Sequence, residues 1–294
     1  MFHSMSNTLR AALWMTGAIF SFSAMAVAGR ELSFDLDTFE IMTYRSLIGL
    51  MIVGILAFTF GTVNQINTDR FGLHFARNIA HFTGQNLWFY AVTLIPFAQL
   101  FAFEFSVPIW VMIAAPFFLG ERLSALRVFS VLVGFIGILV VTRPWIAGLA
   151  PGIIPAALCA IGFAATNIFT KKLTKTATIT CIMFWLTTLQ LIFGLIGAGY
   201  DGDIALPAAA SVPWVALVGV CGLLAHFCIT RALQLAPATV VLPVDFCRLP
   251  IIAIIGYVFY NEAIDAYIIG GAVLIFAANY LNIWSESKSR KVNT

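Results

Sequence analysis

The chain has 294 residues, of which 61% are hydrophobic and only 10% are charged. Soluble domains have about a quarter of their residues charged, so this composition excludes an ordinary soluble fold and indicates an integral membrane protein. The net charge of +3 is small, and no basic run with interleaved aromatic residues points to a nucleic acid. The five cysteines all lie in apolar runs without a CxxC pair, which predicts buried thiols and no metal site.

Ten apolar segments follow one another along the chain, and each has the roughly 20 residues that a transmembrane helix needs. The connections between them are too short to hold a soluble domain. The first segment also resembles a secretory signal peptide, but its counterpart in the second half of the chain favours a retained helix. The predicted spans are 9–29, 38–60, 73–94, 97–119, 125–143, 152–171, 177–198, 213–234, 237–259 and 265–284.

Lysine and arginine residues near the span ends predict the orientation of the chain. With the N-terminus inside the cell, the opposite side carries only Arg30 and Arg143. We therefore expect both termini in the cytoplasm and the protein in the cell inner membrane. The cytoplasmic side would carry Arg10, Arg70, Arg77, Arg122, Arg127, Lys171, Lys172, Lys175, Arg231, Lys288, Arg290 and Lys291.

The two halves of the sequence match each other at a constant offset of 141 residues. Between Ala91 and Glu121, seven of 31 positions are identical to those 141 residues later, without a gap. Five spans per half is an odd number, so the second half must enter the membrane from the other side. The sequence therefore predicts an all-α fold of two inverted five-helix repeats, residues 1–146 and 147–294, as in secondary transporters.

Four ionisable residues lie well inside predicted spans, namely Arg45, Glu104, Asp245 and Arg248. Each costs about 3 kcal/mol at the centre of a bilayer, so they must pair with one another or face water. Asp245 and Arg248 are three residues apart on one helix face, which predicts an ion pair. The depth of Arg45 suits a pair with Glu104. The alternative is that these pairs only fix the packing of the helices.

Other polar and aromatic residues at membrane depth predict a shared cavity. His81, Gln85 and Trp88 fall on one face of the third span, and His226 stands at the position equivalent to Gln85. A membrane histidine also serves as a simple hydrogen-bonding group between helices, and this alternative stays open for each. The predicted substrate-binding residues are Arg45, His81, Gln85, Trp88, Glu104, Trp110, Asn167, Trp185, His226, Asp245 and Arg248.

Two further features concern the fourth and ninth spans. Pro108 lies near the middle of the fourth span and frees the backbone carbonyl of Glu104, and Pro250 has a similar place in the ninth. Both prolines predict a bend in the helix. Glu121 and Glu262 follow these spans and are expected to hold the turn into the next one.

These residues resemble the drug/metabolite transporter superfamily, and specifically its EamA-type branch of ten-helix bacterial transporters. The likeness rests on the duplicated five-helix unit, on Arg45 in "YRSLIGL" and on "LIPFAQ" followed by "FFLGE" with its weaker copy. In the second copy Asn261 replaces the glycine, and Leu186 stands where Arg45 would recur. The resemblance implies alternating-access transport of small organic solutes, and the chain is similar to S-adenosylmethionine and riboflavin carriers.

The sequence thus predicts a secondary transporter of a small polar or zwitterionic metabolite, such as an amino-acid-like, nucleoside-like or vitamin-like compound. The four intramembrane charges sum to zero, which favours a neutral or zwitterionic solute, and Glu104 or Asp245 would couple transport to protons. No cofactor is expected. The alternatives are a lipid flippase, a non-transporting structural or regulatory protein, and a membrane metalloenzyme. The sequence has no metal-ligand spacing that would support the metalloenzyme. Small-residue faces in the fifth and tenth spans are typical of close helix contacts, either within the chain or between two copies in a homodimer.

Overall fold

The computed structural model describes residues 6–121, 124–143, 145, 151–200 and 202–292, and this part of the chain is all-helical, without a strand. Each of the ten predicted spans coincides with one helix or with consecutive helices. The elements are α1 (Asn7–Leu32), α2 (Thr38–Thr59), η2 (Val63–Gln65), α3 (Phe71–Val92), α4 (Phe97–Glu104), α5 (Val107–Phe118), α6 (Ala125–Thr142), α8 (Ile153–Leu173), α9 (Ile179–Ala198), α10 (Val212–Leu235), α11 (Ala238–Val241), η3 (Leu242–Cys247), α12 (Arg248–Tyr260) and α13 (Ala266–Val292).

Within the described ranges, seven helical segments are long and apolar enough to cross a membrane. Helix α3 is not among them, although it has 22 residues, because polar side chains interrupt its apolar sequence. The apolar parts of α6 and α13 are shorter, at Val128–Val141 and Ala266–Ala278. The seven segments are Asn7–Leu32, Thr38–Thr59, Phe97–Phe118, Ile153–Leu173, Ile179–Ala198, Val212–Leu235 and Ala238–Tyr260. The prediction of a helical membrane protein is confirmed.

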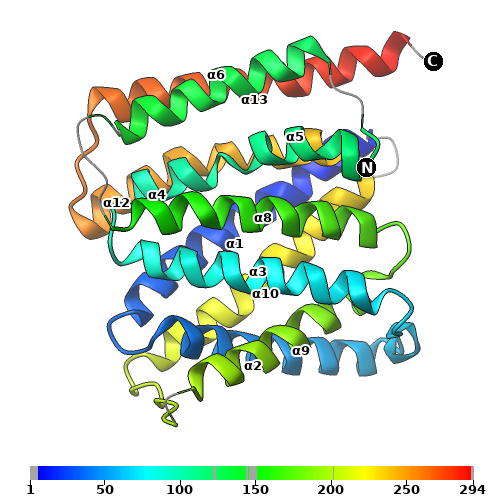
Figure 1. Cartoon of the computed structure of the whole chain (residues 1–294), viewed down its shortest axis with the longest axis vertical. Coiled ribbons are helices and arrows are strands. Elements are labelled where there is room, and N and C mark those ends of the chain that lie inside the picture. Colours follow the sequence, from blue (N-terminus) through cyan, green and yellow to red (C-terminus); the bar gives the residue numbers. More distant parts are fainter. Residues whose placement is uncertain (1–5, 122–123, 144, 146–150, 201, 293–294) are drawn as a thin grey trace.

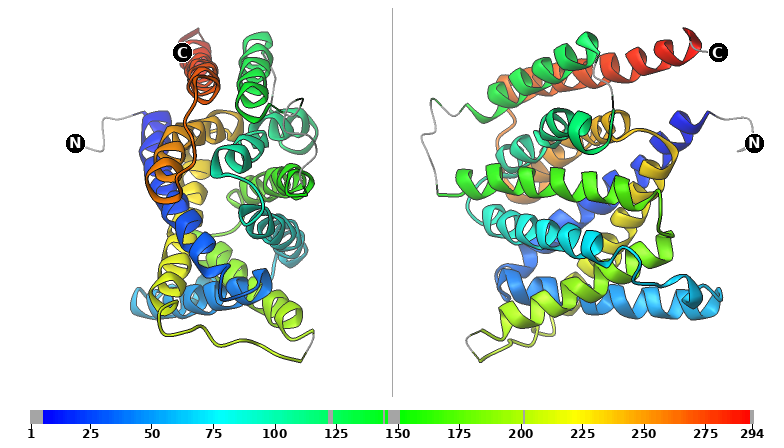
Figure 2. Two further views of the ribbon diagram at one scale, coloured as in Figure 1. Left: turned by 90° about the vertical axis from the view of Figure 1, so that its left-hand side faces the viewer. Right: turned by 45° about the vertical axis from the view of Figure 1, so that its right-hand side comes forward.

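Helices from the two halves of the chain pack against each other rather than forming separate bundles. Helix α6 lies along α13 at one edge of the molecule, and α2 packs on α9 at the opposite edge (Figure 1). Between these edges α1 packs on α10, α3 on α8, and α4 on α12. Both views of Figure 2 keep the α6–α13 pair at one end of the molecule. The interior is therefore made jointly by both halves.

Local backbone geometry recurs at the 141-residue offset. Asp37 and Thr178 cap the N-termini of α2 and α9 with their side chains. Gly61 and Gly202, which end the corresponding segments, both have positive φ angles of 63° and 83°. Each position requires a conformation that glycine adopts without strain.

The sequence difference at Asn261 proves to be conservative in structure. Gly120 has a φ angle of 67°, and Asn261 at the equivalent place has a φ angle of 53°. Asparagine is the residue that most readily replaces glycine in the left-handed conformation at the end of a helix. The same turn therefore forms in both halves.

Glu121 and Glu262 are expected to hold the turn that follows each span, but in the structure each carboxylate binds the opposite half of the chain. Glu262 accepts hydrogen bonds from the backbone N–H of Phe97, at 3.0 Å and 3.2 Å, at the start of α4. Glu121 accepts from the backbone N–H of Ala238, at 3.1 Å, at the start of α11. A carboxylate stabilises the free N–H groups at a helix N-terminus. The two glutamates thus fasten the halves together at both ends of the paired segments.

The fourth and ninth predicted spans are both broken near their middle. Helix α4 ends at Glu104 and α5 begins at Val107, which confirms the bend predicted from Pro108. In the ninth span the break is a 3₁₀ segment that contains Pro243. Pro250 lies in the first turn of α12, where a missing N–H costs little. The bend predicted at Pro250 therefore lies earlier in the chain, in the 3₁₀ segment Leu242–Cys247.

The two carboxylate caps lead to a difference in stability that can be measured. We expect Glu121→Ala to lower the free energy of unfolding by about 1 kcal/mol, the usual cost of losing an N-cap. Glu262→Ala should cost about 2 kcal/mol, because Glu262 also pairs with Arg30 at 2.6 Å, with both side chains mostly buried. Thermal unfolding in detergent would rank the variants, with exposed Asp69→Ala as the control. Equal losses for Glu262→Ala and Asp69→Ala would refute the capping role.

Candidate functional site: a buried ionic chamber

A cavity of about 60 Å³ lies between α1, α3, α4, α5, α8, α10, η3 and α12. Both halves of the chain contribute to its wall. Eight of the eleven predicted site residues line it, namely His81, Gln85, Trp88, Glu104, Asn167, His226, Asp245 and Arg248. We call this cavity the chamber.

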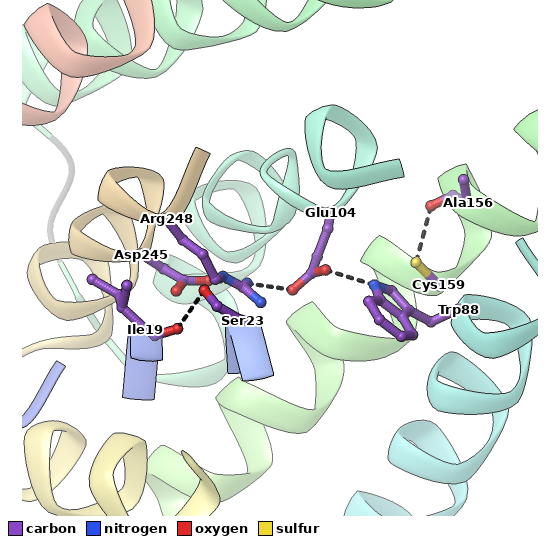
Figure 3. A network of polar contacts seen from close by, with 8 residues as sticks. All are labelled: Ile19, Ser23, Trp88, Glu104, Ala156, Cys159, Asp245 and Arg248. Atoms are coloured by element: carbon purple, nitrogen blue, oxygen red, sulfur yellow. Dashed lines mark hydrogen bonds and ion pairs between the residues drawn. The ribbon is translucent and has the colours of Figure 1, made fainter. Parts of the chain in front are cut away.

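Arg248 joins the two intramembrane carboxylates in the wall of the chamber. Its Nη2 atom lies 2.5 Å from Oε1 of Glu104 and 2.5 Å from Oδ2 of Asp245. The other oxygen of Glu104 accepts a 2.7 Å hydrogen bond from the indole N–H of Trp88. Figure 3 shows these four side chains in a row, with Arg248 between Asp245 and Glu104. The three charged residues form one connected group with a net charge of −1.

Aromatic rings surround the guanidinium group of Arg248. It lies 5.0 Å from the ring centre of Phe22 in α1, and 4.9 Å and 5.5 Å from those of Phe101 and Phe105. A cation is attracted to the face of an aromatic ring, most strongly where water is excluded. These rings therefore help to stabilise a charge in an otherwise apolar interior.

The breaks in the two spans position the charged residues. Glu104 is the last residue of α4, Asp245 lies in the 3₁₀ segment, and Arg248 is the first residue of α12. Irregular backbone at membrane depth is tolerated where it is buried in protein or lines a cavity. The charged group thus sits where both spans depart from the regular helix.

One of the two predicted ion pairs is present in the structure. The pair of Asp245 and Arg248 is confirmed. The pair of Arg45 with Glu104 is wrong, because Glu104 binds Arg248 from the other half of the chain. Arg45 instead approaches the Met42 sulfur at 3.4 Å and lines a separate cavity of about 20 Å³.

Two histidines meet in another part of the chamber wall. The Nε2 atoms of His81 in α3 and His226 in α10 are 2.8 Å apart, so one imidazole donates a hydrogen bond to the other. Both side chains are buried. Gln85 and Trp88 also line the chamber, so the predicted common face of α3 is confirmed.

Two predicted aromatic site residues lie away from the chamber. Trp110 is 40% exposed and donates its indole N–H to the Ser106 hydroxyl at 3.1 Å. Trp185 donates to the backbone carbonyl of Asn67 at 2.8 Å, at the connection between α2 and α3. Neither ring is placed to stack on a solute in the chamber.

Arg77 is a buried charge that the sequence analysis grouped with the cytoplasmic charges at the span ends. It is only 1% exposed and lies inside α3, where its Nε atom donates to the Thr170 hydroxyl at 2.6 Å. Because α3 begins at Phe71, Arg77 stands nearly two turns into the helix. With Arg77 added to Arg45, Arg248, Glu104 and Asp245, the formal charges of these five residues sum to +1 rather than zero.

Removing Arg248 is expected to destabilise the protein strongly. Arg248→Met would leave Glu104 and Asp245 without their shared partner, and an unpaired buried charge costs about 3–5 kcal/mol. Thermal unfolding of the purified protein should therefore show a large loss for Arg248→Met. Arg231→Met, at an exposed position of α10, provides the control and should change little. Similar melting temperatures for both variants would contradict the central role of Arg248.

Comparisons with known proteins agree with this architecture. The sequence model of the EamA-like transporter family matches residues 9–143 and again residues 150–284. An S-adenosylmethionine uptake transporter of Rickettsia felis is 28% identical over 94% of this chain and 93% of its own. A riboflavin transporter of Vibrio cholerae is 25% identical over 97% of both chains.

The fold also has a solved counterpart. A crystal structure that is 17% identical in sequence covers 97% of this chain and 99% of its own, with a TM-score of 0.76. The family and the named relatives confirm the prediction of a metabolite transporter rather than an enzyme. This multi-pass membrane protein therefore belongs to the EamA-like transporter family.

Proposed function

We propose that the protein is a secondary-active transporter that carries a small polar or zwitterionic organic metabolite across the inner membrane by alternating access. The observation that carries this proposal is the charged group of Glu104, Asp245 and Arg248 in the wall of a chamber shared by both halves. Charges at membrane depth are costly and mark substrate or ion pathways. Such sites lie between the two halves of many secondary transporters.

The proposed architecture is ten transmembrane helices in two inverted repeats, 1–146 and 147–294, with both termini in the cytoplasm. The reciprocal caps of Glu121 and Glu262 support it, as does the double match of the family. The helix contacts fit the same symmetry, because exchanging the halves turns the α1–α10 pair into the α8–α3 pair. The boundary at 146/147 and the charged side chains of Arg122, Arg127, Lys288, Arg290 and Lys291 lie outside the described residues.

The size of the chamber supports a carrier that changes shape. Pockets that hold small organic ligands usually measure about 300–1,000 Å³. The chamber of about 60 Å³ is much smaller, so a metabolite requires the walls to move apart. The breaks at 105–106 and 242–247 are suited to this movement, because irregular segments bend more easily than continuous helices.

The relatives narrow the choice of solute. We propose S-adenosylmethionine-like or riboflavin-like compounds as the first substrates to test, from the names of the transporters of Rickettsia felis and Vibrio cholerae. The net negative charge of the Glu104–Arg248–Asp245 group suits a cationic part of the solute. Trp88, which is held by Glu104, offers an indole beside it.

Transport by the purified protein provides the direct test. In proteoliposomes with an inward proton gradient, we expect uptake of labelled S-adenosylmethionine or riboflavin at least about tenfold above empty liposomes. If Glu104 carries the coupling proton, Glu104→Gln should lose gradient-driven accumulation yet keep exchange of labelled for unlabelled solute. Trp110→Phe serves as the control, because Trp110 lies outside the chamber. Unchanged accumulation by Glu104→Gln would exclude Glu104 as the coupling site.

The same vesicles separate the carrier from its alternatives. A flippase would move a fluorescent phospholipid between the leaflets and take up neither solute. A structural protein would do neither. Failure of both labelled compounds together with lipid movement would therefore replace the carrier proposal by the flippase.

A further inference from the structure

Two arginines in the interior lack the acidic partners that Arg248 has. Arg45 is 6% exposed and Arg77 is 1% exposed. Among the described residues, no carboxylate forms an ion pair with either of them. Nη1 and Nη2 of Arg77 are buried without a hydrogen-bond partner. Five N–H donors per guanidinium are thus largely unused by the protein.

The charge on these two arginines has no local compensation. A guanidinium group does not lose its proton in a protein, so burial does not neutralise it. An isolated buried charge costs several kcal/mol. The carboxylates of Glu104 and Asp245 are already bound to Arg248, and neither contacts Arg45 or Arg77 by a hydrogen bond or ion pair. A further anion would therefore find strong donors and an uncompensated positive charge.

Both arginines lie next to the histidine pair. Arg77 stands one turn before His81 on α3, and a Cβ atom at Gly222, one turn before His226 on α10, would lie only 2.3 Å from Nε of Arg45. A side chain larger than hydrogen at position 222 would displace the guanidinium group. Arg45 lines the cavity beside Gly222, whereas Arg77 lines neither that cavity nor the chamber and donates to Thr170 of α8.

The surroundings of Arg45 suit a small polar group. Its cavity of about 20 Å³ has Ser46, Thr187 and Gln190 in the wall. That volume is close to what one water molecule needs. Gln190 also donates to the Asn78 carbonyl at 2.9 Å, directly beside Arg77 in the sequence. The site therefore matches the terminal group of a solute and not a whole metabolite.

We propose that Arg45 and its cavity form an anion subsite beside the His81–His226 pair that binds the carboxylate of the transported solute, and that the uncompensated charge of Arg77, one turn from His81, adds to the attraction. This inference rests on the proposed transport function. The Glu104–Arg248–Asp245 group would then hold the cationic end of the same solute, and the histidine pair lies between the two ends. Arg248 is not part of the anion subsite, because its charge is already shared between two carboxylates.

A binding test that does not depend on transport uses formate as the probe. In sodium formate the purified full-length protein should melt roughly 3 °C or more above its value in equal sodium gluconate, whose anion is too bulky for the site. Arg45→Met with Arg77→Met should abolish this difference without lowering the melting temperature in gluconate, because two unpaired buried charges are removed. The single Arg45→Met should reduce the shift, and exposed Arg70→Met should keep it. No formate shift in the native protein, or its persistence in the double variant, would overturn the subsite.

A transport test assigns the anion to the solute. S-adenosylmethionine and its decarboxylated form differ only in the carboxylate, and we expect the native protein to take up the first at least about tenfold faster. Arg45→Met should reduce this preference. Equal uptake of both together with a formate shift would overturn the assignment to the solute and identify a free anion as the ligand. A formate shift without any uptake would contradict the proposed function and support the subsite. Uptake without a formate shift would support the proposed function and overturn the subsite.

Discussion

The ionic contact of Arg248 with Glu104 and Asp245 is the constraint on which the rest of the interior depends. It joins the fourth and ninth spans, which come from different halves of the chain, at a depth where unpaired charges are costly. The aromatic rings around the guanidinium and the indole N–H on Glu104 satisfy the remaining interactions. Under the proposed function, a substrate that enters the chamber would compete with this contact, so the same interaction that holds the halves together is suited to respond to binding.

The ends of the two broken spans are fixed, and their middles are irregular. Glu262 holds the start of α4, and Glu121 holds the start of α11. Between these anchors the chain leaves the regular helix at Glu104 and again around Pro243. Movement concentrated at these breaks would change the distance between the carboxylates and Arg248 without unfastening the ends. The fold thus combines stable contacts at its ends with a centre whose charges determine its shape.

The sequence predicts the positions of the helices well, because long apolar runs and the 141-residue offset are local or periodic signals. It also predicts the Asp245–Arg248 pair, which depends on spacing along one helix. It fails where partners come from different helices. The position of Arg45 along its span suggests Glu104 as a partner, but depth says nothing about the direction in which a side chain points. For the same reason the sequence predicts Trp110 and Trp185 in the cavity, although both lie away from the chamber. The burial of Arg77 follows from packing against α8.

A double-mutant cycle between Glu104 and Arg248 tests the central claim most directly. The free energies of unfolding of the native protein, Glu104→Gln, Arg248→Met and the double variant give the coupling between the two halves. The account predicts a coupling of about 2 kcal/mol or more, because Arg248→Met leaves the Glu104 carboxylate buried without its cation, and this loss is absent once Glu104 is replaced by Gln. Additive effects, within about 0.5 kcal/mol, would show that the two residues do not interact and would contradict the account.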